Sequence, residues 1–215
     1  MTTDVTDRRS YWRSFYASAA SVDSLQPPSQ FAAFVAQEIE TGSAVFDVGC
    51  GNGRDSLFFA TLGFKVVALD QSQNAIAAAQ QKAGKRKSDN LHFVVGSITD
   101  PYLDGALASL VSKSACVYAR FFLHAITESE QTYFFQTLAQ RLQPGHKVAL
   151  EYRTDADQFI EKTAPPHFRR YQSADAVNAA LTDLGFQLLY AIEGQGFAKY
   201  GNEDAIVARA IFQKL

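Results

Sequence analysis

From residue 44 onward, short apolar runs typical of buried strands alternate with segments whose apolar residues recur at helical spacing. Strands are predicted at 44–49, 65–69, 91–95, 115–119, 146–152, 186–192 and 205–213. Helices are predicted between them at 54–62, 73–83, 103–111, 128–142 and 173–184. Apolar strands that alternate with helices indicate a parallel sheet covered on both faces.

The last two predicted strands have only a loop between them, around the sequence GQGFAKYGNED. They should pair antiparallel, because a parallel crossover needs a dozen or more residues and usually a helix. The predicted fold class is therefore α/β, a Rossmann-like doubly wound sheet of seven strands. It is mostly parallel, with an antiparallel C-terminal hairpin and helices on both faces. Such sheets bind their ligands beyond the carboxyl ends of the strands.

The first 42 residues have a different pattern. The sequence YWRSFYASAA predicts an aromatic-rich helix, and a Pro-Pro pair then separates it from a second helix at 29–40, with Ser29 placed to cap it. We therefore predict an N-terminal helical lid or cap at 1–42 and a single globular domain at 43–215.

The sharpest local signal is a glycine-rich turn between the first predicted strand and its helix. In the run DVGCGNGRDS, Gly49, Gly51 and Gly53 alternate with other residues, and Asp70 stands at the end of the next strand. Glycines let the main chain turn tightly and approach a ligand closely. An acid at that place can accept hydrogen bonds from both ribose hydroxyls of an adenosine. The spacing G-x-G-x-G differs from the G-x-G-x-x-G of dinucleotide-binding domains.

The run DVGCGNGRDSLFFA, followed by Asp70, resembles the first two motifs of class I S-adenosylmethionine (SAM)-dependent methyltransferases. The resemblance extends over about residues 45 to 215, since the strand order and terminal hairpin also match. The sequence GCGNGRDS is similar to that of the small-molecule group that includes the tellurite-resistance and thiopurine-like methyltransferases. The resemblance implies SAM as cofactor and S-adenosylhomocysteine (SAH) as product. We expect no metal, because no His, Cys or Asp cluster has metal-ligand spacing.

The resemblance also implies residue roles. Asp47 would anchor the ammonium group of SAM, Asp70 would hold its ribose, and Gln71 would lie against its adenine. Ser97 stands where many relatives carry an acid, so its contact with the adenine amino group would be weaker. An N-terminal aromatic residue would lie near the sulfonium. The predicted cofactor-binding set is Asp47, Gly49, Cys50, Gly51, Asn52, Gly53, Asp70, Gln71, Ser97, Ile98, Arg120, Tyr11 and Tyr16.

The acceptor is expected beside the ends of the fourth and fifth predicted strands. Arg120 follows a buried strand and needs an anion, either Glu151 or the substrate. His124 is a candidate general base, and the alternative is that it caps the next helical region. We predict Arg120 and His124 as catalytic residues. The predicted acceptor-binding residues are Trp12, His124, Glu151, Arg153, His167, Arg169 and Arg170.

Four arginines (120, 153, 169 and 170) converging on one cleft would suit an acceptor that carries phosphate or carboxylate. The alternative for the pair 169–170 is a solvated loop, which we expect for one of the two. An aromatic stripe such as Tyr11, Trp12 and Tyr16 can equally be core packing.

Composition narrows the class of protein. Of 215 residues, 47% are hydrophobic and 20% charged, with a net charge of −2, so no global basic field favours DNA. The two cysteines, Cys50 and Cys116, lie in apolar runs, which argues against a disulfide framework and for a reducing compartment. No signal peptide or membrane span is evident. We predict a cytoplasmic protein, monomeric or homodimeric, that does not bind DNA or membranes.

Three functions compete. The first is methyl transfer to an O or N atom of a small-molecule, saccharide or phosphate-bearing acceptor by in-line displacement. The second is methylation of RNA or protein, which would favour a basic surface or an additional recognition domain. The third is a non-catalytic SAM-binding regulator. The intact glycine loop, Asp70 and the polar residues beside the predicted cleft favour the first.

Overall fold

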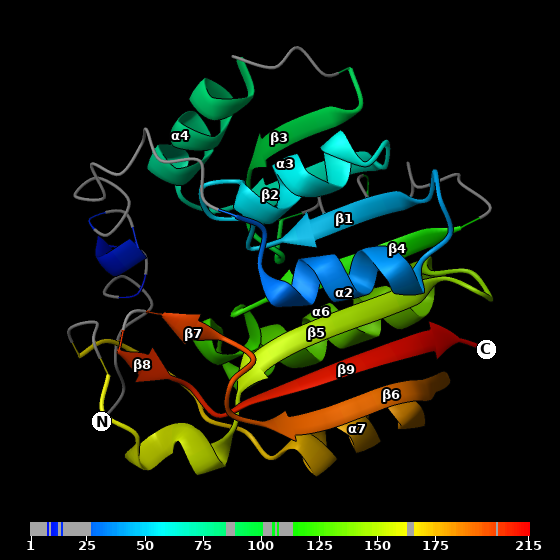
Figure 1. The fold of residues 1–215 in the computed structure, drawn as a ribbon. Coiled ribbons are helices and arrows are strands. Elements are labelled where there is room, and N and C mark those ends of the chain that lie inside the picture. The colour runs from blue at the N-terminus through cyan, green and yellow to red at the C-terminus, as the bar shows by residue number, and fades with distance from the viewer. Residues whose placement is uncertain are drawn as a thin grey trace.

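The computed structural model describes residues 8, 10–12, 14, 27–84, 89–100, 105, 107, 114–162, 166–200 and 202–215. Its centre is a seven-stranded sheet in the order β3-β2-β1-β4-β5-β9-β6 (Figure 1). The strands are β1 (Ala44–Val48), β2 (Lys65–Asp70), β3 (Leu91–Val95), β4 (Ala115–Arg120), β5 (Lys147–Arg153), β6 (Phe186–Gly194) and β9 (Val207–Lys214). The predicted seven-stranded doubly wound sheet is confirmed.

The first five strands are parallel, and the last two complete the sheet in the antiparallel direction. β1 lies between β2 and β4, and β5 pairs with β4 on its other side. β9 then inserts antiparallel between β5 and β6. All five residues of β1 are buried, as expected for a central strand covered on both faces. The predicted C-terminal hairpin is confirmed.

Helices cover both faces of the sheet (Figure 1). On one face, α2 (Gln30–Glu38) and α3 (Arg54–Thr61) pack with the strands in a core that contains Phe31 and Phe59. On the other face, α6 (Glu128–Arg141) and α7 (Ala174–Asp183) bury Phe134 and Leu181 in a second core. α4 (Gln73–Gly84) packs beside β2 and β3. The structure therefore has the two packed layers of helices that the sequence predicts.

Local signals explain where several helices begin. The Ser29 hydroxyl accepts a hydrogen bond from the amide of Ala32, which caps α2 as predicted. Thr127 and Glu130 form a capping box at the start of α6. Because Phe31 packs in the core, α2 belongs to the body of the fold. The predicted cap at 1–42 stays a prediction, because Arg8, Ser10–Trp12 and Ser14 alone are described before residue 27.

Two details differ from the expectation or lie outside it. The connection between β6 and β9 contains a short hairpin of β7 (Lys199–Tyr200) and β8 (Glu203–Asp204), where we predicted only a loop. Most of the predicted helix 103–111 lies outside the described residues.

Short 3-10 helices follow β4 at η1 (Leu123–Ala125) and β5 at η2 (Asp155–Phe159). None of the helices in the described ranges is both long and apolar enough to cross a membrane.

Candidate functional site

A cavity of about 560 Å³ lies at the carboxyl edge of the parallel strands. Its wall runs from the glycine-rich turn after β1, past the ends of β2, β3 and β4, to the segment around Arg169 and to the β7–β8 hairpin. Arg8, Tyr11 and Trp12 of the N-terminal segment also line it. This is the edge at which doubly wound sheets bind ligands, and the volume suits a small molecule.

The glycine-rich turn presents main chain to the cavity. Gly49 and Gly51 have φ values of 72° and 55°, a region that favours glycine. A Cβ atom on Gly49 would lie 2.7 Å from Cδ2 of the Phe122 ring, so a side chain does not fit there. The turn therefore keeps a bare stretch of backbone against the cavity wall.

Asp70 ties the end of β2 to this turn. One carboxylate oxygen accepts a hydrogen bond from the Gly51 amide at 2.9 Å, and the other accepts from the Ser72 amide at 2.8 Å. Burial raises the pKa of Asp70, and these two hydrogen bonds partly offset that effect. Each carboxylate oxygen has lone pairs left for a hydroxyl of a ligand. Asp70 thus both shapes the turn and faces the cavity.

Asp47 lies at the bottom of the cavity, near the end of β1, and is 2% exposed. Its carboxylate accepts a hydrogen bond of 2.5 Å from the Ser56 hydroxyl. Burial raises the pKa of Asp47 to about 7, to which the nearby Asp55 and Asp70 also contribute, while the Ser56 bond opposes the rise. A cation placed here would favour the ionised carboxylate.

The other predicted cofactor residues divide into two groups. Cys50, Asn52, Gln71, Ser97 and Ile98 line the cavity. Gly53 does not: a Cβ atom on it would lie 2.8 Å from both Ala79 and the Phe93 ring. The expectation that Gly53 faces a ligand is therefore corrected, since this glycine permits close packing of α3 against α4 and β3.

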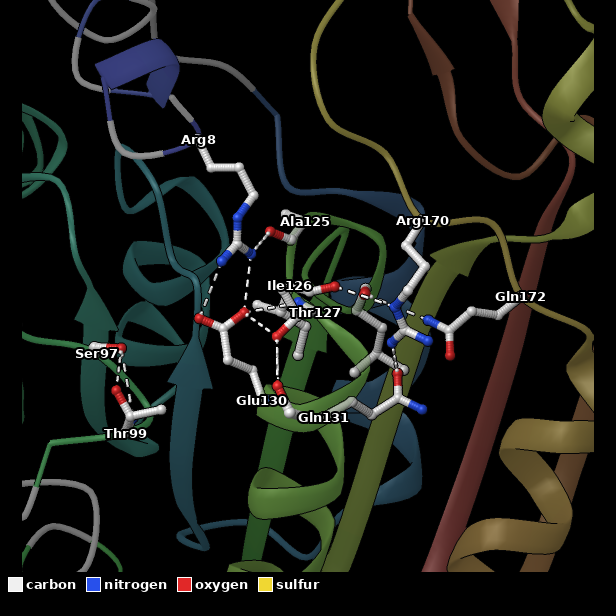
Figure 2. Close-up of polar contacts among 12 residues, drawn as sticks. Arg8, Ser97, Thr99, Ala125, Ile126, Thr127, Glu130, Gln131, Arg170 and Gln172 are labelled. Carbon is white, nitrogen blue, oxygen red and sulfur yellow. Dashed lines mark hydrogen bonds and ion pairs between the residues drawn. The ribbon is translucent and has the colours of Figure 1, made fainter. Parts of the chain in front are cut away.

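The polar groups after β3 form a small local network. The hydroxyls of Ser97 and Thr99 share a hydrogen bond of 3.1 Å (Figure 2). The Ser97 amide donates to the carboxylate of Asp100 at 2.7 Å. The Asp100 carboxylate is therefore close to Ser97, but it binds the main chain and does not line the cavity.

The chain turns sharply after β4, at Phe121. This residue has a φ of 54°, which is rare for a bulky side chain and costs about 1–3 kcal/mol. Its amide donates to the Glu151 carbonyl at 2.7 Å, and its ring lies beneath the guanidinium groups of Arg120 and Arg153, at 4.5 and 5.4 Å. The strained turn places Phe121 on the cavity wall.

Glu151 lies beneath this wall and is 1% exposed. Its two carboxylate oxygens lie 2.8 Å from Nε of Arg120 and 2.7 Å from Nε of Arg209. Arg120 lines the cavity, but Glu151 does not. Of the two partners expected for Arg120, the structure shows the internal carboxylate, while the guanidinium still borders the cavity. The expectation that Glu151 contacts an acceptor is corrected: it holds Arg120 in place.

The four predicted arginines do not all converge on the cavity. Arg120, Arg153 and Arg169 line it. Arg153 is paired with Asp157 at 2.7 Å and with Glu203. Arg170 points away and bonds the Ile126 carbonyl and the Gln131 side chain (Figure 2). The expectation that all four arginines converge on the cavity is therefore wrong for Arg170. Arg170 is not a solvated loop residue either, because it is half-buried and bonded to other parts of the chain.

His124 lines the cavity but is only 4% exposed. Burial lowers its pKa well below the usual value, and the cations Arg153, Arg169, His167 and Arg120 add to this effect. The imidazole is therefore neutral near pH 7, and its Nδ1 has no hydrogen-bond partner among the described residues. A neutral imidazole can accept a proton or a hydrogen bond from a ligand.

The N-terminal aromatic residues face the same cavity. The rings of Tyr11 and His167 are stacked 3.9 Å apart, and Trp12 lies edge-on to His167 at 5.5 Å. Arg8 binds Glu130 and the Ala125 carbonyl (Figure 2). Tyr16, a predicted cofactor residue, lies outside the described residues.

Sequence reasoning missed several wall residues, including Arg8, Phe122, Glu130, Lys199 and Glu203. The capping-box spacing of Thr127 and Glu130 was a usable signal for Glu130. No comparable signal marked Lys199, because a two-residue strand has no detectable periodicity. Within the part of the chain that the structure describes, no three His, Cys, Asp or Glu side chains gather as a metal site requires.

Comparison with known proteins agrees with this geometry. A family model described as a methyltransferase domain matches residues 39–181. The ribosomal protein L11 methyltransferase of Clostridium botulinum is 31% identical over 84 residues, which is 37% of this chain and 26% of that protein. The magnesium-protoporphyrin O-methyltransferase of Rhodobacter capsulatus is 34% identical over 80 residues, 37% of this chain and 35% of that protein. The matches thus span about a quarter to a third of these relatives.

The fold comparison extends over the whole chain. A TehB-like SAM-dependent methyltransferase from Corynebacterium glutamicum superimposes with a TM-score of 0.64 at 15% identity, covering 99% of this chain and 100% of that one. At this identity the likeness shows the fold alone.

Proposed function

The chain belongs to the methyltransferase domain family, and on that premise we propose that it transfers a methyl group from SAM to a small acceptor. The observation that carries the proposal is one continuous cavity that joins the glycine-rich turn and Asp70 to the polar groups after β4 and β5. One half can hold a cofactor while the other holds an acceptor. The similarity to a porphyrin O-methyltransferase supports a small-molecule acceptor.

The residues of the first half fit SAM. The bare backbone at Gly49 and Gly51 would lie against its amino-acid tail, and Asp47 would bind its ammonium group. Asp70 would accept hydrogen bonds from the ribose hydroxyls, with Gln71, Ser97 and Ile98 around the adenine. The cavity's Phe122 ring fills the space that a side chain at position 49 would need, so substitution there would damage this half.

The bound sulfonium supplies a methyl group that is already activated. Transfer breaks the sulfur–carbon bond, leaves its electron pair on sulfur, and forms a carbon–oxygen or carbon–nitrogen bond on the acceptor. The chain's own residues therefore contribute mainly alignment and exclusion of water. The N-terminal Tyr11 and Trp12, together with His167, would cover the reacting groups, as a cap would.

An acceptor hydroxyl or protonated amine must also lose a proton. We propose that His124 accepts it, because its imidazole is buried, neutral and free at Nδ1 among the described residues. Arg120, held by Glu151, would orient the acceptor beside it. His124→Gln should then lower kcat more than it raises KM. An unchanged kcat would mean that the acceptor is already deprotonated when it binds.

The acceptor is proposed to be anionic, carrying carboxylate or phosphate. The support is Arg169, which is half-buried on the cavity wall and has no carboxylate partner among the described residues. Guanidinium groups bind both kinds of anion well. The described free thiols Cys50 and Cys116 support a reducing compartment, and we propose the cytoplasm.

Calorimetry with SAH tests the proposal. Wild-type protein should bind SAH, and Gly51→Val should abolish binding because valine is strained at a φ of 55° and would project toward the ligand. Gly63→Val is the matched control, since Gly63 has a φ of 88° but open space around it and does not line the cavity. Equal SAH affinity in wild type and Gly51→Val would reject this cofactor site.

A further inference from the structure

The β7–β8 hairpin is an element of the cavity wall that the sequence did not predict. It lies near the carboxyl end of β5 (Figure 1), and it borders the same cavity as Arg8, Tyr11 and Trp12. It contributes Lys199 and Glu203 to the wall, and Ala198 directly precedes it there. Two strands of two residues each could not hold their position without support from the rest of the fold.

That support comes from several contacts at the base of the hairpin. Glu203 is paired with Arg153 of β5, and the Ile206 amide donates to the Asp157 carboxylate at 2.8 Å. Arg209 donates to the Phe197 carbonyl at 2.8 Å and lies over the Phe197 ring at 4.9 Å. The hairpin is therefore fixed to the framework of the sheet, and so is the starting point of the Lys199 side chain.

The cations on the wall are of two kinds. Four have a carboxylate within ion-pair distance: Arg8 with Glu130, Arg54 with Asp55, Arg120 with Glu151, and Arg153 with Asp157 and Glu203. Arg169 and Lys199 have none among the described residues. Asp204 is the register partner of Lys199 across the hairpin, but its carboxylate accepts the Gly196 amide at 2.8 Å. Among the described residues, these two cations of the cavity wall therefore lack an ion pair with a carboxylate.

We propose that Arg169 and Lys199 form an oxyanion subsite, and that the hairpin selects acceptors through Lys199. This inference rests on the proposed function and specifies it. Lys199 is exposed and Arg169 half-buried, whereas His124 is only 4% exposed. The acceptor is therefore a molecule with its carboxylate or phosphate at the outer end, and with its nucleophilic oxygen or nitrogen at the inner end, toward the donor.

The test titrates SAH-saturated protein with inorganic phosphate, with benzoate, and with benzamide, a neutral analogue of similar shape, at constant ionic strength. Wild type should bind at least one anion about tenfold more tightly than benzamide, since hydrogen bonds between ionised groups are stronger than those to a neutral amide. The preferred anion distinguishes a phosphate acceptor from a carboxylate one. Arg169→Gln and Lys199→Gln should each remove most of this preference.

Lys65→Gln is the matched control, because it removes an exposed charge from the amino-terminal end of β2, away from the cavity. It should change neither anion affinity nor SAH affinity. Two results would overturn the inference: anion binding as strong in Lys199→Gln as in wild type, or no preference of wild type for an anion over benzamide. If wild type still binds SAH in either case, the proposed function is unaffected. Failure of wild type to bind SAH would instead reject the proposed function.

Discussion

The guanidinium group of Arg8 forms a bidentate ion pair with the Glu130 carboxylate, with Nη1 2.9 Å from Oε2 and Nη2 3.2 Å from Oε1 (Figure 2). The same carboxylate accepts hydrogen bonds from the amide and hydroxyl of Thr127. Burial would raise the pKa of Glu130, but these hydrogen bonds lower it overall. Glu130 therefore takes part in the N-terminal cap of α6 and also holds Arg8 at the cavity wall.

The first prediction concerns this ion pair. Arg8→Gln should speed the release of SAH by about tenfold, because losing a charged hydrogen-bond partner costs about 1.5–3 kcal/mol and frees the segment that carries Tyr11 and Trp12. Stopped-flow measurement of SAH release checks it. Arg8→Lys should release SAH at a rate between those of wild type and Arg8→Gln, since lysine keeps the charge without the bidentate geometry. Release at the wild-type rate in Arg8→Gln would show that the pair does not retain the ligand.

The second prediction concerns the stability of the buried triad of Arg120, Glu151 and Arg209. Glu151→Gln should destabilise the fold by about 3–5 kcal/mol, because it leaves two largely buried guanidinium groups without their shared carboxylate. Urea unfolding measures the change. Glu193→Gln, on the exposed face of β6, should stay within about 0.5 kcal/mol of wild type. A similarly small change for Glu151→Gln would contradict the pairing.

The third prediction is a pH dependence of SAH binding. Because the pKa of Asp47 is raised to about 7, the free protein holds a proton there below that pH, and binding an ammonium group should release it. SAH affinity should therefore rise about fivefold between pH 6 and pH 7. Calorimetry in two buffers of different ionisation enthalpy should detect the released proton. Asp47→Asn should bind more weakly and without this pH dependence; a dependence that persists would assign it to another group.

The fourth prediction tests the neutral state of His124. Its pKa is lowered in the folded protein, so the unfolded chain takes up the proton first as pH falls below about 6.5, and stability is lost in that range. Each pH unit costs up to about 1.4 kcal/mol. Wild type should lose more stability between pH 7.5 and 5.5 than His124→Gln. Equal curves for wild type and His124→Gln would contradict a buried neutral imidazole.

The sequence predicted those parts of the molecule that depend on local signals. Continuous apolar runs such as Val66–Leu69 predicted where the strands lie along the chain, and the alternating glycines with Asp70 marked the part of the cavity wall that we propose for the cofactor. The glycine pattern did not show which glycines face the cavity, because Gly53 is needed for contacts with Ala79 and Phe93 that come from other elements.

Pairing between charged residues was harder to predict. Arg153, Arg169 and Arg170 look alike in the sequence, yet one is neutralised by acids, one is unpaired among the described residues, and one binds Gln131. Those partners come from distant parts of the chain, so only the fold determines them. Sequence reasoning was thus least accurate for the part of the cavity wall after β4 and β5, which is assembled from several elements.

A crystal structure of the complex with SAH would show whether the glycine-rich turn and Asp70 hold the cofactor. We expect the amino-acid tail of SAH along the backbone at Gly49 and Gly51, and its ribose hydroxyls within hydrogen-bond distance of the Asp70 carboxylate. SAH bound elsewhere, or a pyrophosphate-containing nucleotide preferred over SAH in this corner of the cavity, would contradict the account.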